Sequence, residues 1–265
     1  MYSDKKIYKG YTLFFKNKDE EAYNNVKDIV DGNYNILKII KDTERNYVAV
    51  IAINNHKYIL KEIRAEVNLF QRRVQTILKK GEVVTTLNNF LMLEKQNITG
   101  LTKVYAAIIK RNICIEKSYL LMEYIDGCEI KTINDIDKIM TFIVNLHKLK
   151  RYHGDLNTSN FLIRKNGNIA VLDSQLKKDI FFNFKRSYDI LTLKEDLLVL
   201  KLNYDVYRRA NINKFSIGFI LAFIIKRLKK TKLINIIRNQ KKKIREKKYE
   251  HKKSNEINED KNCER

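Results

Sequence analysis

The stretch YHGDLNTSNFLI occupies residues 152–163, and IAVLD follows at residues 169–173. Together they place Asp155 in a polar loop, Asn160 five residues later, and Asp173 at the end of a second apolar run. The Asn-Gly pair between the two runs predicts a β-hairpin, which brings the three side chains toward one point. One carboxylate can accept a hydroxyl proton, while the amide and the other carboxylate can hold Mg²⁺ on the phosphates of a nucleotide. The competing interpretation is an Asx-rich turn without chemistry, which does not require a second Asp at hairpin distance.

The sequence on either side predicts a β-rich half followed by a helical half. Residues 135–149 carry the clearest amphipathic pattern, with Asn134 as the expected N-cap. A second helical pattern covers residues 65–79, and Gly81 is expected to end it. From residue 187 onward the sequence is helical in pattern. The remaining expected elements are a helix at 19–30 and strands at 13–15, 35–40, 47–53, 56–63, 103–110, 117–124, 161–163 and 169–172.

These elements predict an α+β chain of two lobes joined by a short connector. The N-terminal lobe is expected to span residues 1–122, the connector 123–127 and the C-terminal lobe 128–240. Residues 241–265 are polar and basic, and are expected to form a disordered tail.

The composition fits a globular protein with a large excess of positive charge. Of the 265 residues 44% are hydrophobic, so a core can form, and the formal net charge is +22. The three widely spaced cysteines argue against a disulfide framework or a zinc finger, and Cys114 and Cys128 are expected in the core. The N-terminus shows no signal peptide, and no apolar run reaches the roughly 18 residues of a membrane span. The expected location is therefore cytoplasmic.

The hairpin pattern resembles the catalytic segment of the protein-kinase-like superfamily, whose signature is H-x-D, four residues, Asn, and an Asp on the next strand. The resemblance implies a protein-kinase-like two-lobed fold that binds ATP and Mg²⁺. It implies that Asp155 is the catalytic base and that Asn160 and Asp173 are metal ligands. Lys61, at the end of the third strand of a meander, matches the lysine that holds the nucleotide phosphates.

Two further positions extend the resemblance to the nucleotide base and to the lysine. Residues 122–127, MEYIDG, look like the hinge between lobes, so the backbone groups of Glu123 and Ile125 would pair with adenine. Both Glu66 and Glu82 are candidates for the glutamate that pairs with the strand lysine, and Glu82 is favoured.

Two departures from the superfamily pattern are also visible. The first turn of the meander, residues 41–46, contains no glycine, so the Gly-rich phosphate lid is absent or rebuilt. Residues 173–175 read DSQ in place of D-F-G. These departures keep open a pseudokinase scaffold, which would bind a nucleotide without turnover.

Several longer strings are similar to the lipopolysaccharide core heptose(II) kinase family, RfaY/WaaY. These strings are KYILK at 57–61, EYIDGCE at 123–129, GDLNTSNF at 154–161, LDSQLK at 172–177 and YDIL at 188–191. The resemblance extends from residue 1 to about 245. It implies ATP-dependent phosphorylation of a sugar hydroxyl, heptose of the inner core, with the lipopolysaccharide core or lipid A as acceptor. An RNA-linked atypical kinase also stays open, because HGDLNTSN resembles small kinases of the tRNA threonylcarbamoyl-adenosine machinery.

The basic C-terminal end predicts a second kind of partner. Residues 226–253 contain 14 Lys or Arg and two Glu, and they follow an apolar segment at 215–225. That segment is either a core helix of the C-terminal lobe or a helix lying on a membrane. With a lipid-linked acceptor, the basic tail predicts peripheral attachment to the anionic inner face of the cytoplasmic membrane. No nucleic-acid motif accompanies the charge, so a nucleic-acid partner is not expected, and no oligomeric state is predicted.

Three polar side chains near the loop have alternative roles. Asp189 either anchors the backbone of the catalytic loop from the following helix or caps that helix. His147 and His153 could join Asp155 in a metal site, but packing roles are favoured for both histidines.

Overall fold

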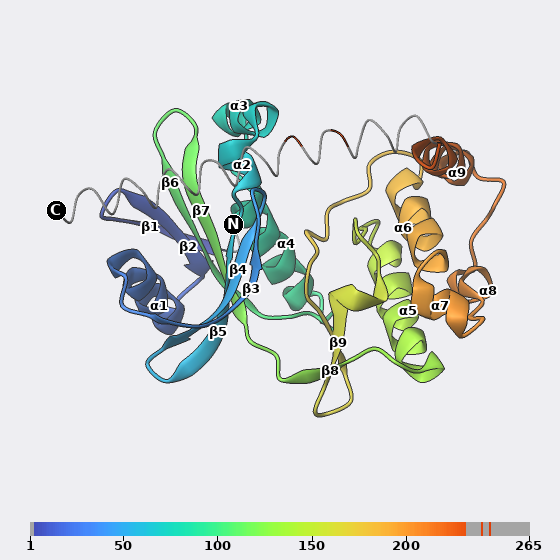
Figure 1. Ribbon diagram of the computed structural model, residues 1–265, viewed down its shortest axis with the longest axis horizontal. Helices are drawn as coiled ribbons and strands as arrows, with labels where there is room; N and C mark the ends of the chain where they lie inside the picture. The colour runs from blue at the N-terminus through green and yellow to red at the C-terminus, as the bar shows by residue number, and fades with distance from the viewer. Residues whose placement is uncertain (1–2, 232–239, 241–243, 245–265) are drawn as a thin grey trace.

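The computed structural model describes residues 3–231 together with Gln240 and Ile244. Its N-terminal part is one antiparallel sheet in the strand order β1-β2-β6-β7-β5-β4-β3 (Figure 1). The strands are β1 (Ser3–Tyr8), β2 (Tyr11–Lys16), β3 (Asn35–Asp42), β4 (Tyr47–Ile53), β5 (His56–Glu62), β6 (Val104–Arg111) and β7 (Ile115–Glu123).

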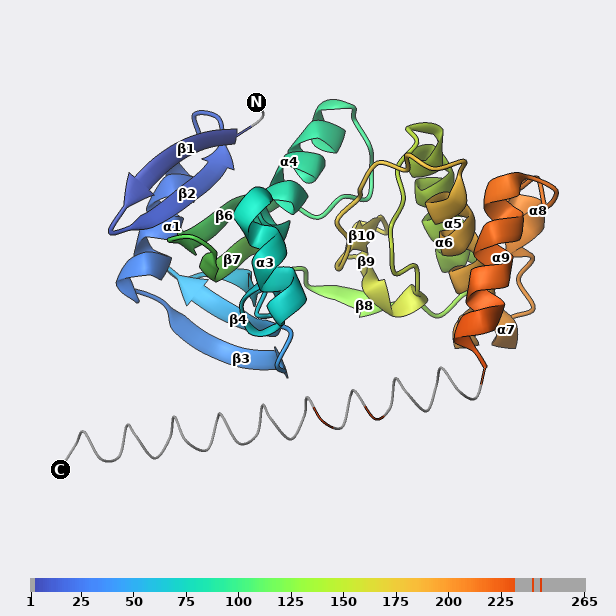
Figure 2. The ribbon, with the colours of Figure 1, turned by 90° about the horizontal axis from the view of Figure 1, so that it is seen from above.

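One helix covers each face of this sheet, α1 (Glu20–Asp31) on one side and α4 (Glu82–Lys95) on the other (Figure 2). Side chains of β6 alternate between the two faces, as a strand requires. Ala106 and Ile108 pack in the cluster that contains α1, whereas Ala107 and Ile109 pack in the cluster that contains α4. Burial on both faces explains why the central strands are almost continuously apolar.

The C-terminal part begins with a small sheet in the order β10-β9-β8 and continues as helices. The helix α5 (Ile133–Lys148) shares a buried cluster with α4 and β10, so both parts of the chain meet in one core. The other elements are β8 (Gly127–Glu129), β9 (Phe161–Arg164), β10 (Ile169–Val171), α6 (Phe184–Lys194), α7 (Leu197–Lys201), α8 (Val206–Ala210) and α9 (Ile217–Lys229).

The helix expected over residues 65–79 is in fact two helices. The first, α2 (Ala65–Asn68), ends at Leu69, whose extended backbone (φ −93°, ψ 111°) separates it from α3 (Phe70–Leu78). Gly81 does not end this helix but caps the start of α4, which the sequence did not predict. Its φ of 95° and the close approach of the Ile115 side chain both favour glycine at this position.

Two local expectations were also wrong. Thr132, rather than Asn134, caps α5: its hydroxyl accepts from the N–H of Asp135 at 3.2 Å, and the Asp135 carboxylate accepts from the N–H of Thr132 at 2.9 Å. This reciprocal capping box places Asn134 inside the first turn. Cys128 lies exposed on β8 instead of in the core, and Cys114 is only partly buried.

The other expected strands and helices are present within a few residues of their predicted bounds, and two short strands, β1 and β8, are additional. The expected disordered tail at residues 241–265 lies outside the described residues, apart from Ile244. No helix in the described part of the chain is both long enough and apolar enough to cross a bilayer.

Candidate active site

Two aspartates from the following helices hold the polar loop that carries Asp155. Asp189 is 1% exposed within α6 and accepts from the backbone N–H groups of His153 at 2.6 Å and Gly154 at 2.9 Å. This confirms the anchoring role, because α6 begins five residues earlier and Asp189 is not its cap. Asp196, the N-cap of α7, accepts from the N–H of Thr158 at 2.9 Å. Both ends of the loop are therefore fixed by carboxylates.

Asp155 lies exposed between these two anchors, close to Asn160. Its Oδ1 accepts from Asn157 Nδ2 at 2.7 Å. The amide nitrogen of Asn160 donates to the Asp155 carbonyl at 2.7 Å and lies 3.5 Å from Asp155 Oδ2. Because the amide uses its donor side toward the loop, its oxygen is the side that can face a cation.

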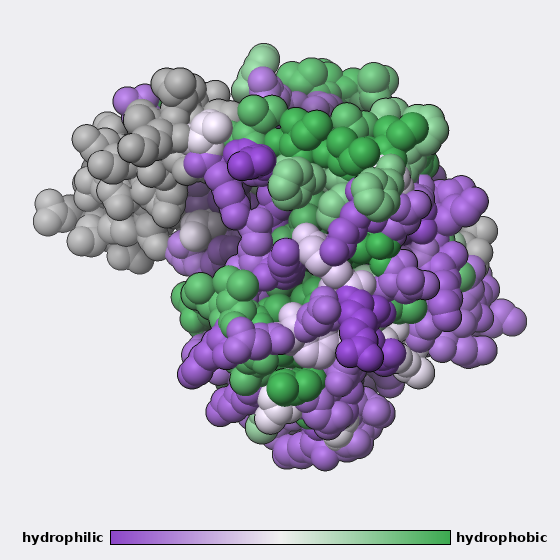
Figure 3. All heavy atoms as spheres, turned by 90° about the vertical axis from the view of Figure 1, so that its right-hand side faces the viewer, coloured by the Kyte–Doolittle hydropathy of each residue, from purple (hydrophilic) through white to green (hydrophobic). Residues whose placement is uncertain are grey.

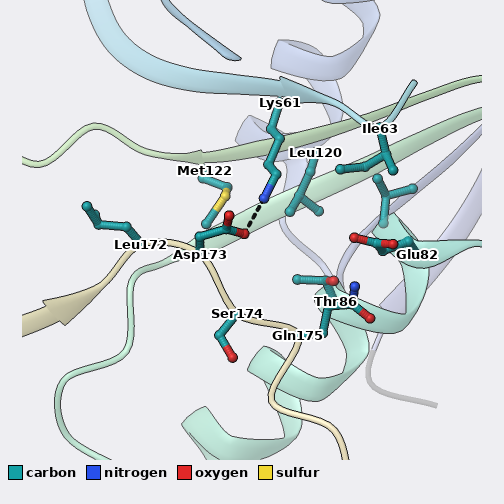
Figure 4. A pocket seen from close by; sticks show the side chains of 11 residues that line it. Lys61, Ile63, Glu82, Thr86, Leu120, Met122, Leu172, Asp173, Ser174 and Gln175 are labelled. Carbon is teal, nitrogen blue, oxygen red and sulfur yellow. Dashed lines mark hydrogen bonds and ion pairs between the residues drawn. The ribbon is translucent and has the colours of Figure 1, made fainter. Parts of the chain in front are cut away.

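Lys61 and Asp173 point toward each other from opposite sides of the cleft between the two parts of the chain (Figure 4). The Lys61 ammonium forms an ion pair with Asp173 Oδ1. Glu82 lines the same pocket from the first turn of α4, but its carboxylate bonds Arg72 at 3.3 Å. Glu66 does not line this pocket and accepts from the N–H of Glu82 at 2.9 Å. The expected pair of Lys61 and Glu82 is therefore not made in this structure, although the two residues share the pocket.

Hydrogen bonds fix the segment after Asp173, where the sequence lacks the aromatic residue of D-F-G. The Ser174 hydroxyl donates to the His153 carbonyl at 2.7 Å and accepts from the N–H of Leu176 at 3.1 Å. Asn89 on α4 donates from Nδ2 to the carbonyl of Gln175 at 2.7 Å. These bonds connect the segment to both the polar loop and α4, so Asp173 is positioned without an aromatic side chain.

The glycine-free turn between β3 and β4 is closed and anchored by its own polar groups. The Thr43 hydroxyl donates to the Asn46 carbonyl at 3.0 Å, which closes the turn. The Arg45 carbonyl accepts from the N–H of Ala65 at 2.8 Å, which ties the turn to the start of α2. The glycine-free turn is thus short and is tethered to the start of α2.

The expected hinge residues lie at the junction of the two sheets. The Glu123 carboxylate forms an ion pair with Arg164 of β9 and accepts from the N–H of Lys103 at 3.0 Å. Burial opposes ionisation, but these hydrogen bonds are stronger and hold the pKa of Glu123 below its ordinary value. The side chain of Glu123 is therefore structural, and its carbonyl and the N–H of Ile125 are the candidates for contact with adenine.

The donor set of the cleft fits a magnesium nucleotide. Mg²⁺ prefers oxygen ligands and commonly takes only one or two carboxylates from a protein, with phosphates and water completing the shell. The Asp173 side chain is half exposed, whereas the Lys61 side chain is largely buried and presents one cation to the cleft. The Asn160 carbonyl accepts from the N–H of Leu172 at 2.9 Å, which places Asn160 beside the residue before Asp173. The chain therefore offers the ligand types that such a complex requires.

The alternative site of His147, His153 and Asp155 is not formed. Across residues 3–231, 240 and 244, no group of three or more His, Cys, Asp or Glu could hold a metal ion. The His153 ring is buried against Phe161, with 5.2 Å between the ring centroids, and burial lowers its pKa. His147 lies 3.5 Å from the Asp189 carboxylate, so both histidines have the expected packing roles.

Sequence reasoning missed several residues that position the site. Asp196 could have been found, because an Asp directly before an apolar helical run is an N-cap signal. Ser174, Asn89 and Arg164 had no comparable signal, since their partners lie 21, 86 and 41 residues away along the chain.

The chain is similar to known proteins both in sequence and in structure. The family model described as "Lipopolysaccharide core biosynthesis protein (WaaY)" matches residues 1–197. The lipopolysaccharide core heptose(II) kinase WaaY of Escherichia coli K12 is 27% identical over 189 residues, which is 64% of this chain and 75% of that protein. A probable bifunctional tRNA threonylcarbamoyladenosine biosynthesis protein of Methanobrevibacter smithii is 33% identical over 89 residues, 32% of this chain and 16% of that protein.

A solved structure, described as WaaP in complex with acyl carrier protein, resembles this fold with a TM-score of 0.52. The likeness covers 87% of this chain and 98% of that chain at 12% identity, and it concerns the fold alone. The α+β, kinase-like class predicted from the sequence is confirmed.

Proposed function

This chain belongs to the WaaY family of lipopolysaccharide core biosynthesis proteins, and we propose from that premise that it is a kinase that phosphorylates heptose of the lipopolysaccharide core. The relative from Escherichia coli carries the name of this activity. The family resemblance expected from the sequence is confirmed. The observation that carries the proposal is that Lys61 and Asp173 pair within one pocket, while Asn160, which bonds the Asp155 carbonyl, also accepts at its own carbonyl from the N–H of Leu172, the residue before Asp173.

We propose that ATP supplies the phosphoryl group and that Asn160 and Asp173 hold its Mg²⁺. The metal would neutralise charge on the phosphates, as it does in other phosphoryl transfers. Lys61, now paired with Asp173, would brace the phosphates once the carboxylate is occupied by the metal. The carbonyl of Glu123 and the N–H of Ile125 are the proposed contacts for the adenine base.

Asp155 is proposed to orient the acceptor hydroxyl and to take its proton. The carboxylate is exposed, and it accepts from Asn157 within the anchored loop. Phosphoryl transfer requires little covalent chemistry from the protein, so a fixed position of this group accounts for most of its expected effect.

The division into an N-terminal lobe (1–122), a hinge (123–127) and a C-terminal lobe (128–240) is part of the same proposal. The large sheet ends at Glu123 and the small sheet begins at Gly127, which supports a hinge between them. An acceptor attached to lipid A lies at a membrane, so we propose that the protein works at the inner face of the cytoplasmic membrane as a peripheral protein.

A phosphorylation assay on purified core acceptor, with the product identified by mass spectrometry, tests the proposed function. Wild-type protein with ATP and Mg²⁺ should add one phosphate to heptose. Asp155→Asn should lose this transfer, while Asp31→Asn, the same chemical change at the ion pair with Lys9 at the end of α1, should retain it.

Nucleotide binding measured on the same samples separates a kinase from a pseudokinase. Binding of ATP without turnover on any core acceptor would favour the scaffold. Near wild-type turnover by Asp155→Asn would show that the base is misassigned.

A further inference from the structure

The helix α9 packs with only one of its faces. Gly218, Phe219 and Ala222 are buried, and Phe219 and Ala222 pack in a small cluster with Leu191 of α6. The opposite side remains exposed, although it is apolar. This outer face consists of Ile217, Ile220, Phe223, Ile224 and Leu228, which are 45–62% exposed. The segment is therefore both a packed helix of the C-terminal part and an apolar surface.

A second apolar segment lies against the first. Residues 180–182, Ile-Phe-Phe, follow the catalytic segment, and their side chains are 88%, 53% and 65% exposed. The backbone of Phe182 sits directly on α9 at Gly218, where a Cβ atom would lie 1.7 Å from the Phe182 carbonyl oxygen. Only glycine permits this contact, so the two segments are built to adjoin. We call residues 180–182, Phe215 and the outer face of α9 the apolar platform.

The apolar platform forms a band across the upper part of the C-terminal end of the molecule (Figure 3). Single exposed apolar residues are common on protein surfaces, but a contiguous apolar patch of this kind marks a site of interaction. Cations lie close to both of its segments along the chain. Lys178 and Lys185 flank residues 180–182 in the sequence, and Arg227, Lys229 and Lys230 lie at the end of α9. Two of these already have partners, because Lys229 donates to the Tyr188 hydroxyl at 3.2 Å and Lys230 pairs with Glu195 at 2.8 Å.

We propose that the apolar platform docks on an anionic lipid surface, with its apolar side chains at the level of the headgroups and its cations against the lipid charges. An amphipathic helix with basic residues beside its apolar face is the arrangement that binds such an interface. A second copy of the chain is disfavoured, because it would bring the same cations together. An acidic protein partner is the remaining alternative, and the vesicle assay separates it from a lipid surface.

The apolar platform lies close enough to the cleft to serve the proposed function. The biological reason for membrane docking rests on that proposed function. The segment from Asp173 to Ile180 connects the cleft to the platform (Figure 1). Seven residues span at most about 25 Å, so the candidate metal ligand lies within that distance of the platform. Further, an isolated bridge between Arg151 and Lys178 fixes this segment to the chain just after α5. Docking would therefore hold Asp173 within about 25 Å of the surface of the membrane that contains the acceptor.

Sedimentation with vesicles tests the proposal on the full chain, without acceptor or nucleotide. Vesicles of phosphatidylcholine with phosphatidylglycerol should bind the wild type, and binding should weaken with salt and be lost on pure phosphatidylcholine. The double variant Phe181→Ser/Phe223→Ser should bind about tenfold or more weakly, because two exposed rings no longer leave water. The matched control Phe70→Ser/Leu78→Ser alters two exposed apolar residues of α3 and should bind like the wild type.

A tryptophan probe keeps the test informative even where the double variant folds poorly. The chain contains no Trp, so Phe223→Trp introduces a single indole into the platform and Phe70→Trp a single indole on α3. With bound vesicles, the first should shift to shorter emission wavelength and be quenched by brominated lipid, and the second should not.

Equal vesicle binding by the double variant, or no quenching at position 223 in the bound protein, would overturn the proposal. The proposal would also be overturned if the wild type self-associated in solution, the double variant did not, and vesicles bound neither of the two proteins. Because the assay contains no acceptor, its result is independent of whether the kinase activity is confirmed.

Discussion

The anchor of the catalytic loop can be tested by the single change Asp189→Asn. Asp189 is buried and accepts two backbone N–H groups from consecutive residues, His153 and Gly154. Hydrogen bonds to a charged acceptor contribute about 1.5–3 kcal/mol each, and an asparagine can accept only one of these two bonds as a neutral group. Its amide N–H₂ would also face a buried N–H. The free energy of unfolding should therefore fall by about 2–4 kcal/mol.

We also expect Asp189→Asn to lower kcat, because the anchored residues directly precede Asp155. Asp155 is the next residue after Gly154, so a released anchor shifts the proposed base directly. A misplacement of about 1 Å can reduce the rate by about a hundredfold, so kcat for heptose phosphorylation should fall roughly tenfold to a hundredfold. The KM for ATP should change less than kcat, because the segment after Asp173 is also held by Asn89 of α4, which lies outside the loop.

Two control variants separate the effect of a displaced loop on kcat from the effect of a lower free energy of unfolding. Asp205→Asn makes the same chemical change at the N-cap of α8, where Asn caps equally well, and should leave unfolding and kcat unchanged. Val206→Ala removes a buried side chain of α8 and should destabilise the fold by about 1–3 kcal/mol without lowering kcat at a temperature where it is folded. Urea unfolding and steady-state kinetics measure both effects. Wild-type kcat in folded Asp189→Asn would refute the anchoring argument.

Three further outcomes are expected. Asp173→Asn should weaken Mg²⁺-dependent ATP binding as well as transfer, measured by titration calorimetry with and without Mg²⁺; unchanged Mg²⁺-dependent affinity would contradict its role as metal ligand. Burial raises the pKa of Glu66, so its contribution to stability is fully present below the unfolded pKa and is lost as pH rises through the folded pKa. Glu66→Gln should therefore reduce the loss of stability as the pH rises above the ordinary glutamate pKa of about 4.3. The same pH dependence of the urea midpoint in variant and wild type would count against this interpretation. Truncation after Thr231 removes most of the basic tail and should lower binding to anionic vesicles at low salt while ATP affinity is unchanged; equal vesicle binding would leave the tail without that role.

The sequence by itself determined the features that depend on local spacing. The hairpin with Asp155, Asn160 and Asp173, the meander ending in Lys61 and the amphipathic helix α5 are all encoded within short windows, where strand and helix periods can be read directly. The helix α4 escaped prediction because apolar side chains surround much of it, and a helix buried on several sides shows no clear polar stripe.

Only the tertiary structure decided which distant groups meet. Asp189 and Ser174 act on the catalytic loop across gaps of 36 and 21 residues, and no period in the sequence records such contacts. The same holds for the pocket, where Lys61 pairs with Asp173 and Glu82 turns toward Arg72. For α9, the sequence allowed a core helix or a membrane helix. The structure gives it one buried and one exposed apolar face, because burial is set by the neighbours that fold against a helix and not by its own composition.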